Sequence, residues 1–406
     1  MSFLFAWRYF KAKKSTNAIN IIAWVSIVAI MVGTAALILV LSVFNGFEGL
    51  VKGLYSSFYT DLKVIPEKAR IMRVTEDQLK KLQGLKGIRN YSMVLEEKAM
   101  IQNGDYQSAV TMKGVDDHYR YTTGLAAHII NGEYELGDED SPKMIMGVGV
   151  EGALGLIADR NIFQLSIFLP KKNESEKIDF LDNISMDTIQ SSAAFAIQQD
   201  FDNKYAITNI AFLKKAMALG PDEYGAIEIA LNDPDDPDNV RGQVRKIFGE
   251  RFTVQNKYEQ NKSLYMVMTL ERWFVYGVLS LILVVAAFNM VGALTMLVLE
   301  KQKDIAILHA LGGKRSFIQR IFLSEGLLLS LIGAGVGMGI AYSLALLQIK
   351  FHLVSLPGSF VISYFPVELR WADFLLVAST VFVVSMIAAW LPARQAARRE
   401  YSLRSE

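Results

Sequence analysis

The sequence has no cysteine, few histidines and almost no excess of charge of either sign. Without cysteine there can be no disulfide, no thiol catalysis and no thiolate metal site. The four histidines are scattered and belong to no HExxH motif, and no nucleophile elbow is recognisable. A formal net charge of +1 gives no support to nucleic-acid binding. Nothing in these patterns points to an enzyme active site, and we exclude nucleic acid as a partner.

Charged residues are also missing from four long stretches, which are residues 15–47, 273–299, 326–349 and 374–393. Each holds the ~20 residues that a helix needs to cross ~30 Å of hydrocarbon. The chain is 52% hydrophobic but still 20% charged, so part of it should lie in a membrane and part in water. We predict transmembrane helices at 19–46, 273–299, 326–348 and 372–391. The first is too long for a typical signal peptide and is read as a retained anchor.

The orientation of these spans follows from the Lys and Arg residues beside them, which resist translocation. They are concentrated in the leader (1–18), in the loop 300–325 and in the tail (392–406). We therefore expect these three segments to be cytoplasmic. The region 47–272 and the short loop 349–371 then lie on the outer side of the membrane.

The outer region 47–272 shows a strand–helix–strand pattern at each end. One pattern is "DLKVIP" (61–66), a helix that opens at Thr75 and "YSMVLEEKAMIQ" (91–102); the other is "GAIEIAL" (225–231), a helix at 237–248 and "RFTVQN" (251–256). We predict that the two units pair into one split βαβ sheet. The residues between them, about 116–224, are predicted to form an inserted β-rich subdomain. The fold class is thus four transmembrane α-helices plus a large extracytoplasmic α+β domain.

Two glycine motifs resemble nucleotide-binding loops but lack essential residues. "GVGVEG" (147–152) fits GxGxxG, yet no clear βαβ partner with an acidic residue follows, so we favour tight helix packing. The "GGK" at 312–314 has Leu308 where a Walker A loop needs Gly, and Arg315 where it needs Ser or Thr. We expect no cofactor, no metal and no ATP hydrolysis in this chain.

The glycines of the third span form overlapping GxxxG pairs that favour helix packing within the chain. They are Gly333, Gly335, Gly337 and Gly339.

The loop between the second and third spans carries the strip "EKQKDIAILHALGGKR" (300–315). Ile305, Leu308 and Leu311 are spaced i, i+3 and i+6, which predicts one apolar stripe, and Gly312 is a natural helix terminator. A helix this short is not stable alone in water, so it should lie against the bilayer or a partner. The residues leave two interpretations open, an interfacial helix anchored by lysines and a docking element.

The segment "VVAAFNMVGALTMLVLEKQKDIAILHALGG" (284–313) resembles the second span and coupling segment of the MacB-like ABC transporter permeases. Its "AAFN" and "EKQKDIAIL" are most similar to the lipoprotein-releasing LolC and LolE type. "LILVLSVFNGFE" (37–48) and "WLPARQAARRE" (390–400) resemble the first span and the end of that type. The tail "REYSLRSE" departs from the pattern, because it lacks an Asp-Pro.

This resemblance implies a permease that extracts lipoproteins from the outer leaflet of the inner membrane and passes them to a LolA-like periplasmic carrier. ATP and Mg would be bound by a separate LolD-like ATPase, and a second copy or a paralogue would complete the permease pair. The alternatives are a MacB-like exporter of other amphiphiles and an FtsX-like mechanotransmitting regulator of a cell-wall hydrolase. The implied ATPase-coupling residues are Glu300, Lys301, Asp304, Ile305, Leu308, Leu311 and Gly312.

Two further sites follow from the resemblance. An apolar substrate cavity between the first two spans would be lined near its outer end by Phe44, Phe47, Trp273 and Phe274, which an ordinary aromatic belt would explain as well. A carrier-binding hook would begin at Pro170 in "LPKKNESEKIDF" (169–180) and use Ile178, Phe180 or Leu181 as its anchor, unless this segment is an ordinary solvated hairpin.

Overall fold

The structure is a computed structural model that describes residues 17–156, 164–171, 184–234, 237–356 and 364–398. They fall into two compact units. The helical unit combines the chain up to Leu50 with the chain from Met266 onward, and the sheet unit is Val51–Tyr265. The sheet unit thus covers most of the region 47–272 that was expected outside the membrane.

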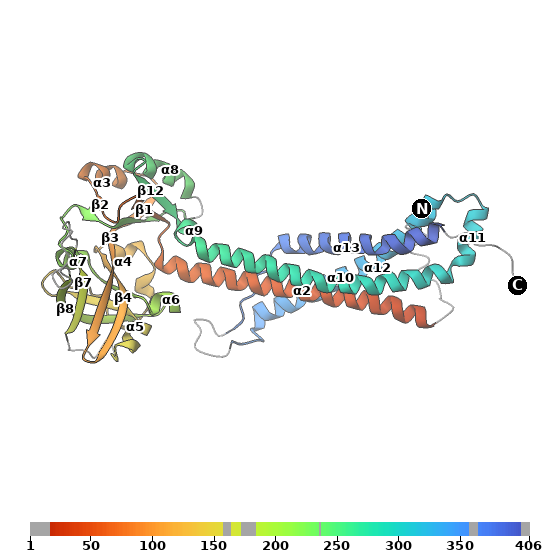
Figure 1. The fold of residues 1–406 in the computed structure, drawn as a ribbon, viewed down its shortest axis with the longest axis horizontal. Coiled ribbons are helices and arrows are strands. Elements are labelled where there is room, and N and C mark those ends of the chain that lie inside the picture. Colours follow the sequence, from red (N-terminus) through yellow and green to blue (C-terminus); the bar gives the residue numbers. More distant parts are fainter. Residues whose placement is uncertain (1–16, 157–163, 172–183, 235–236, 357–363, 399–406) are drawn as a thin grey trace. The chain divides into compact units, whose positions relative to one another are not determined.

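Four long helices make up most of the helical unit (Figure 1). They are α2 (Asn17–Phe58), α10 (Lys262–Glu300), α12 (Arg315–Phe351) and α13 (Trp371–Arg398), and a short helix, α11 (Gln302–Ala310), joins α10 to α12. Each long helix is apolar enough and long enough to cross a membrane, which confirms the four predicted spans. All four exceed those spans, because a helix satisfies its own backbone groups and so need not end where the apolar run ends.

Glycines on α12 allow this helix to approach α2 closely. A Cβ added to Gly333 would lie 2.8 Å from the carbonyl oxygen of Ile27, and one added to Gly337 would lie 2.4 Å from that of Met31. Added Cβ atoms at Gly335 and Gly339 would meet nothing within 4 Å. One of the two overlapping GxxxG pairs therefore packs within the chain as predicted. The other pair faces away from the rest of the helical unit.

The first half of the sheet unit interleaves strands from both ends of the region. Its strand order is β12 (Phe252–Asn256), β1 (Leu62–Pro66), β11 (Ala226–Leu231) and β3 (Ile88–Asn103), with every neighbouring pair antiparallel. The helices α3 (Glu76–Gln83) and α8 (Pro237–Phe248) connect these strands, and α3 begins at the predicted Thr75 capping box. The split βαβ arrangement is confirmed.

The second half of the sheet unit is a closed barrel. β3 pairs with β4 (Tyr106–Val115), and the circuit continues through β9 (Tyr205–Asn209), β6 (Lys143–Gly147), β8 (Ile184–Phe195) and β7 (Leu165–Pro170) back to β3. Its interior holds buried side chains such as Leu95, Met112, Met144, Ile167 and Ile189. The inserted subdomain is continuous with the first half, because the 16-residue β3 belongs to both.

Short elements complete the sheet unit. They are β2 (Met72–Arg73), β5 (Ile129–Gly132), β10 (Glu223–Tyr224), α4 (Tyr119–Thr122), a 3-10 turn η1 (Leu125–His128), α5 (Val148–Ala153), α6 (Gln199–Asp202), α7 (Ile210–Ala216) and α9 (Lys257–Gln260). The GxGxxG segment opens α5, and a Cβ at Gly147 would lie 2.2 Å from the carbonyl oxygen of Asp202. Gly147 and Gly149 therefore serve close packing, as predicted, whereas a Cβ added to Gly152 would meet nothing within 4 Å.

Candidate functional site

The short helix α11 is held against the long helices by one face. Ile305 is 1% exposed and packs with residues of α10, α12 and α13, among them Val298, Phe322 and Ala393. Leu308 is half-buried, whereas Leu311 is 79% exposed. Ile305, Leu308 and Leu311 therefore do not form the single free stripe expected from the sequence. The exposed large apolar side chains here are Ile307 and Leu311. Ile307 is exposed because a residue two positions from the buried Ile305 lies about 200° around the helix from it.

The polar residues predicted at this site lie at both ends of α11. Lys301 is the residue before the helix, and its Nζ is 3.5 Å from Oδ2 of Asp304. Glu300 ends α10 directly before it. At the other end Gly312 has a φ of +84°, the left-handed conformation that favours glycine, and its N–H donates to the carbonyl of His309. The predicted helix termination is confirmed.

The four predicted cavity residues lie on two helices and differ in exposure. Phe44 and Phe47 on α2 are half-buried, and the ring of Phe47 packs edge-on against Phe365 at 5.9 Å. Trp273 and Phe274 on α10 are exposed by 58% and 68%. Of the four, Trp273 alone lines a small cavity of about 230 Å³ between α2 and α10.

A larger apolar groove lies further along the same two helices. We call it the α2–α10 groove; it has a volume of about 700 Å³ and is lined by Ile21, Trp24, Val25, Val28, Ala29, Val32 and Gly33 of α2 and by Ile282, Val285, Ala286 and Asn289 of α10. Asn289 is its one polar lining residue. The helices approach closely at Gly33, where a Cβ would lie 2.9 Å from Leu283 Cδ2. These positions could not be predicted from the sequence, because any lipid-facing helix shows the same apolar spacing.

A buried polar cluster joins three helices at the other end of the helical unit. Asn45 of α2 donates from Nδ2 to Oδ2 of Asp373 at 2.6 Å, and Arg272 of α10 donates from Nη2 to Oδ1 of the same carboxylate at 2.6 Å. Asp373, on α13, is 1% exposed. Beside this cluster Arg370 pairs with Glu48 of α2 at 3.2 Å. These contacts fix the relative positions of α2, α10 and α13. In the sequence, Arg272 and Asp373 border apolar runs, whereas Asn45 lies within one, so nothing there pairs the three residues.

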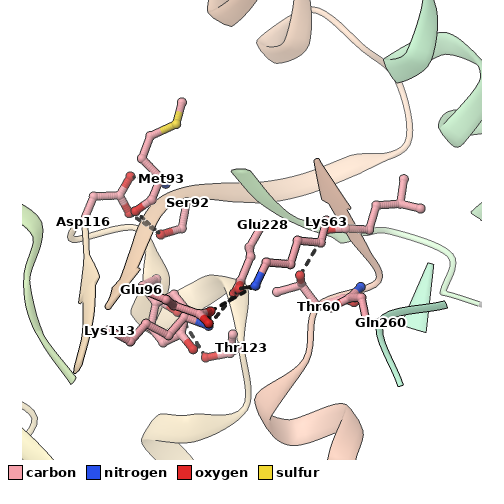
Figure 2. Close-up of polar contacts among 12 residues, drawn as sticks. Thr60, Lys63, Ser92, Met93, Glu96, Lys113, Asp116, Thr123, Glu228 and Gln260 are labelled. Atoms are coloured by element: carbon pink, nitrogen blue, oxygen red, sulfur yellow. Dashed lines mark hydrogen bonds and ion pairs between the residues drawn. The ribbon is translucent and has the colours of Figure 1, made fainter. Parts of the chain in front are cut away.

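The sheet unit contains a buried ion cluster on the neighbouring strands β1, β11, β3 and β4. Figure 2 shows its side chains, Lys63, Glu96, Lys113 and Glu228. Lys113 Nζ is 2.8 Å from Oε1 of Glu228, and both side chains are 1% exposed. Lys63 Nζ is 2.9 Å from Oε1 of Glu96 and 3.3 Å from Oε1 of Glu228. The ammonium of Lys113 also lies 4.9 Å from the ring centre of Phe58. Two ammonium groups and two carboxylates thus neutralise one another.

Charge pairing outweighs desolvation in this cluster. Burial would raise the pKa of Glu96, but the charges of Lys63 and then Lys113 lower that pKa to about 2. Burial would lower the pKa of Lys113, but Glu228 and Glu96 raise it above its ordinary value. Glu96 and Lys113 are therefore both charged at neutral pH, and we interpret the cluster as structural.

The predicted hook falls mostly outside the described residues. Pro170 is exposed at the end of β7, where it pairs with Ile184 of β8. Ile178, Phe180 and Leu181 lie in the segment 172–183, which the structure does not describe. In the described part of the chain, no group of three or more histidines, aspartates and glutamates is arranged to hold a metal ion.

Comparisons with known proteins find one matching family and several full-length relatives. Residues 276–401 match the family described as FtsX-like permease C-terminal. The lipoprotein-releasing system transmembrane protein LolE of Haemophilus influenzae is 26% identical over 98% of this chain and 97% of its own length. The corresponding LolC of Neisseria meningitidis serogroup B is 27% identical over 97% of this chain and 96% of its own length.

Among solved structures, the periplasmic region of MacB from Actinobacillus actinomycetemcomitans is similar to 50% of this chain over 92% of its own length. That likeness has a TM-score of 0.35 at 10% identity. The chain is thus a homologue of the LolC and LolE permeases along nearly its whole length, with an FtsX-like permease domain at its C-terminal end.

Proposed function

We propose that this chain is a permease subunit of an ABC transporter that extracts lipoproteins from the outer leaflet of the bacterial inner membrane and passes them to a LolA-like periplasmic carrier. A separate LolD-like ATPase would bind ATP and Mg, and a second copy of the chain or a paralogue would complete the membrane part. The observation that carries the proposal is the α2–α10 groove, an apolar surface between the first two spans of a chain that is similar to LolC and LolE along nearly its whole length.

The chemistry of lipoprotein release requires such a surface. Withdrawing an acyl chain from hydrocarbon costs ~0.8 kcal/mol per CH₂, so a chain of about 16 carbons costs roughly 13 kcal/mol and a multiply acylated anchor costs tens of kcal/mol. Release therefore needs an apolar path and an energy source. The α2–α10 groove supplies apolar lining with one amide, that of Asn289, and no charge.

The position of α11 suits a contact with the ATPase. Ile305 anchors the helix to α10, α12 and α13, so a force on α11 is passed to three membrane helices. Ile307 and Leu311 remain exposed for a partner, and Lys303 and Lys314 flank them with positive charge. The Lys and Arg distribution supports placing α11 and both termini in the cytoplasm.

The test is ATP-dependent transfer of a labelled lipoprotein to a soluble carrier, with the chain reconstituted beside its ATPase and partner permease. A photoreactive residue at Val28 or Val285 should crosslink to the acyl chains of the lipoprotein. The same residue at Leu331 of α12 or Leu375 of α13 provides the control, because these side chains are 68% and 69% exposed but lie outside the groove.

Equal crosslinking at all four positions would contradict the groove as the acyl path. Crosslinking and transport of small amphiphiles with no lipoprotein transfer would instead favour the MacB-like exporter.

A further inference from the structure

A separate pocket, of about 420 Å³, opens in the sheet unit where the barrel meets the split βαβ half. Four basic side chains from separate elements line it: Lys63 of β1, Arg70 from the loop after β1, Lys98 of β3 and Lys204 directly before β9. Ile65, Val94 and Ala226 add apolar surface. A volume of this size is typical of small-molecule sites and exceeds what a bare inorganic anion needs.

The charge of this pocket is opposite to that of its surroundings. The sheet unit, residues 51–265, carries 26 Lys and Arg against 32 Asp and Glu, so it is negative overall. The pocket has four basic residues and only two carboxylates, Glu96 and Glu97. Like charges gathered in a concave site focus a positive potential there.

Both carboxylates already have cationic partners. Glu96 belongs to the buried ion cluster, with its Oε1 2.9 Å from Lys63 and 3.5 Å from Lys113. Glu97 Oε2 lies 4.0 Å from the guanidinium of Arg70, whose side chain is 88% exposed. No carboxylate in the described part of the chain lies within 4.0 Å of the ammonium of Lys98 or of Lys204.

The sheet brings these two lysines, which both line the pocket, to nearby strand positions. Lys98 pairs with Thr111 of β4, and the N–H of Thr111 donates to the carbonyl of Lys204 at 2.7 Å. The two lysines are therefore near neighbours across β3, β4 and the start of β9, although the sequence separates them widely. The guanidinium of Arg70 belongs to the same pocket and adds a planar fork of donors.

We propose that this pocket binds a phosphate group carried on a small organic body, with Lys98, Lys204 and Arg70 as its ligands. A dianionic or diester phosphate has several oxygens in a tetrahedral arrangement, which suits cations approaching from three separate chain segments. The apolar side chains hold the organic part. The site is separate from the α2–α10 groove and from α11, so it goes beyond the proposed transport function.

The phosphate has two sources, a soluble metabolite or a phospholipid headgroup, and the test separates them. The full chain, in a phosphate-free maltoside detergent, is titrated with glycerol 3-phosphate by calorimetry. In parallel, native mass spectrometry counts the phosphatidylglycerol that the protein retains in competition with phosphatidylcholine. Binding of both ligands indicates that the phosphate alone suffices, and binding of phosphatidylglycerol alone indicates a lipid headgroup.

The double variant Lys98→Gln/Lys204→Gln should weaken the binding of whichever ligand is bound by at least tenfold, because it removes two charge-assisted contacts. The matched control Lys86→Gln/Lys246→Gln removes the same charge from exposed lysines outside the pocket. Lys98→Arg/Lys204→Arg should retain binding, which shows that loss in the first variant is not misfolding. Absence of saturable binding of both ligands to the unaltered chain, or an equal loss in the control variant, would overturn the proposal.

Discussion

Replacing Lys113 by Met should destabilise the sheet unit strongly. The substitution leaves Glu228 and Glu96 with Lys63 as their one remaining cation, in a site where Lys113 and Glu228 are each 1% exposed. Removing one partner of a buried ion pair costs about 3–5 kcal/mol, since the other charge stays desolvated and unpaired. Glu228→Gln should cost a similar amount, because it leaves Lys63 and Lys113 to share Glu96.

Hydrogen exchange of the full chain, followed by mass spectrometry, measures this loss. Lys113 lies on β4 and Glu228 on β11. Exchange of the amides in these two strands should accelerate roughly 10²- to 4 × 10³-fold, because each 1.4 kcal/mol is a factor of ten. The double variant Lys113→Met/Glu228→Gln leaves Lys63 paired with Glu96 in a neutral cluster. Its loss should therefore be smaller than the sum of the single losses by about 1–3 kcal/mol.

An exposed ion pair provides the control. Lys81 and Asp77 of α3 are paired at i, i+4, with side chains 59% and 71% exposed. Lys81→Met should change stability by no more than about 0.5 kcal/mol. The reasoning is refuted if Lys113→Met costs as little as this control, or if the two single losses simply add in the double variant.

Three other expectations concern pH, amine reactivity and coupling. Glu96 has a pKa of about 2, against an ordinary value of 4.5. Its ionised form should therefore stabilise the fold fully above pH 4.5, and this stabilisation should disappear as the pH falls toward 2, with a slope of at most about 1.4 kcal/mol per pH unit. The acid unfolding curve of Glu96→Gln should lack this pH-dependent loss of stability. Burial lowers the pKa of Lys214 to about 8 despite the nearby charges of Asp222 and Glu223. Hydrogen bonds to Asp140 and Glu139 instead raise the pKa of the adjacent Lys215. An amine-selective reagent at pH 8 should therefore modify Lys214 faster than Lys215, and equal rates by peptide mapping would contradict this. Leu311→Asp should lower ATPase binding or coupled transport without affecting membrane insertion, because Leu311 contributes exposed apolar area. Leu353→Asp changes a similarly exposed position beyond α12 and should lower neither. Unchanged coupling of Leu311→Asp in a transport assay would show that α11 is not the contact.

Local rules and composition were enough to predict much of this chain. The four spans could be predicted from the length of the charge-free stretches, because each is apolar over the length that a helix needs to cross the hydrocarbon core of a membrane. The start of α3 at Thr75 and the end of α11 at Gly312 follow from hydrogen bonding and backbone conformation within a few residues. The interleaved half of the sheet unit could be predicted because each βαβ pattern lies in one short segment.

The groove and the buried clusters could not be read from the sequence, because they depend on contacts between residues far apart in the chain. Apolar spacing along α2 does not distinguish a side chain that faces lipid from one that faces a groove, since lipid and neighbouring helices are equally apolar. Lys113 and Glu228 are 115 positions apart, and Asn45 and Asp373 are 328 apart. Only the tertiary structure brings them within hydrogen-bonding distance, and only burial makes their pairing matter, because a charge without a partner is costly where water is excluded.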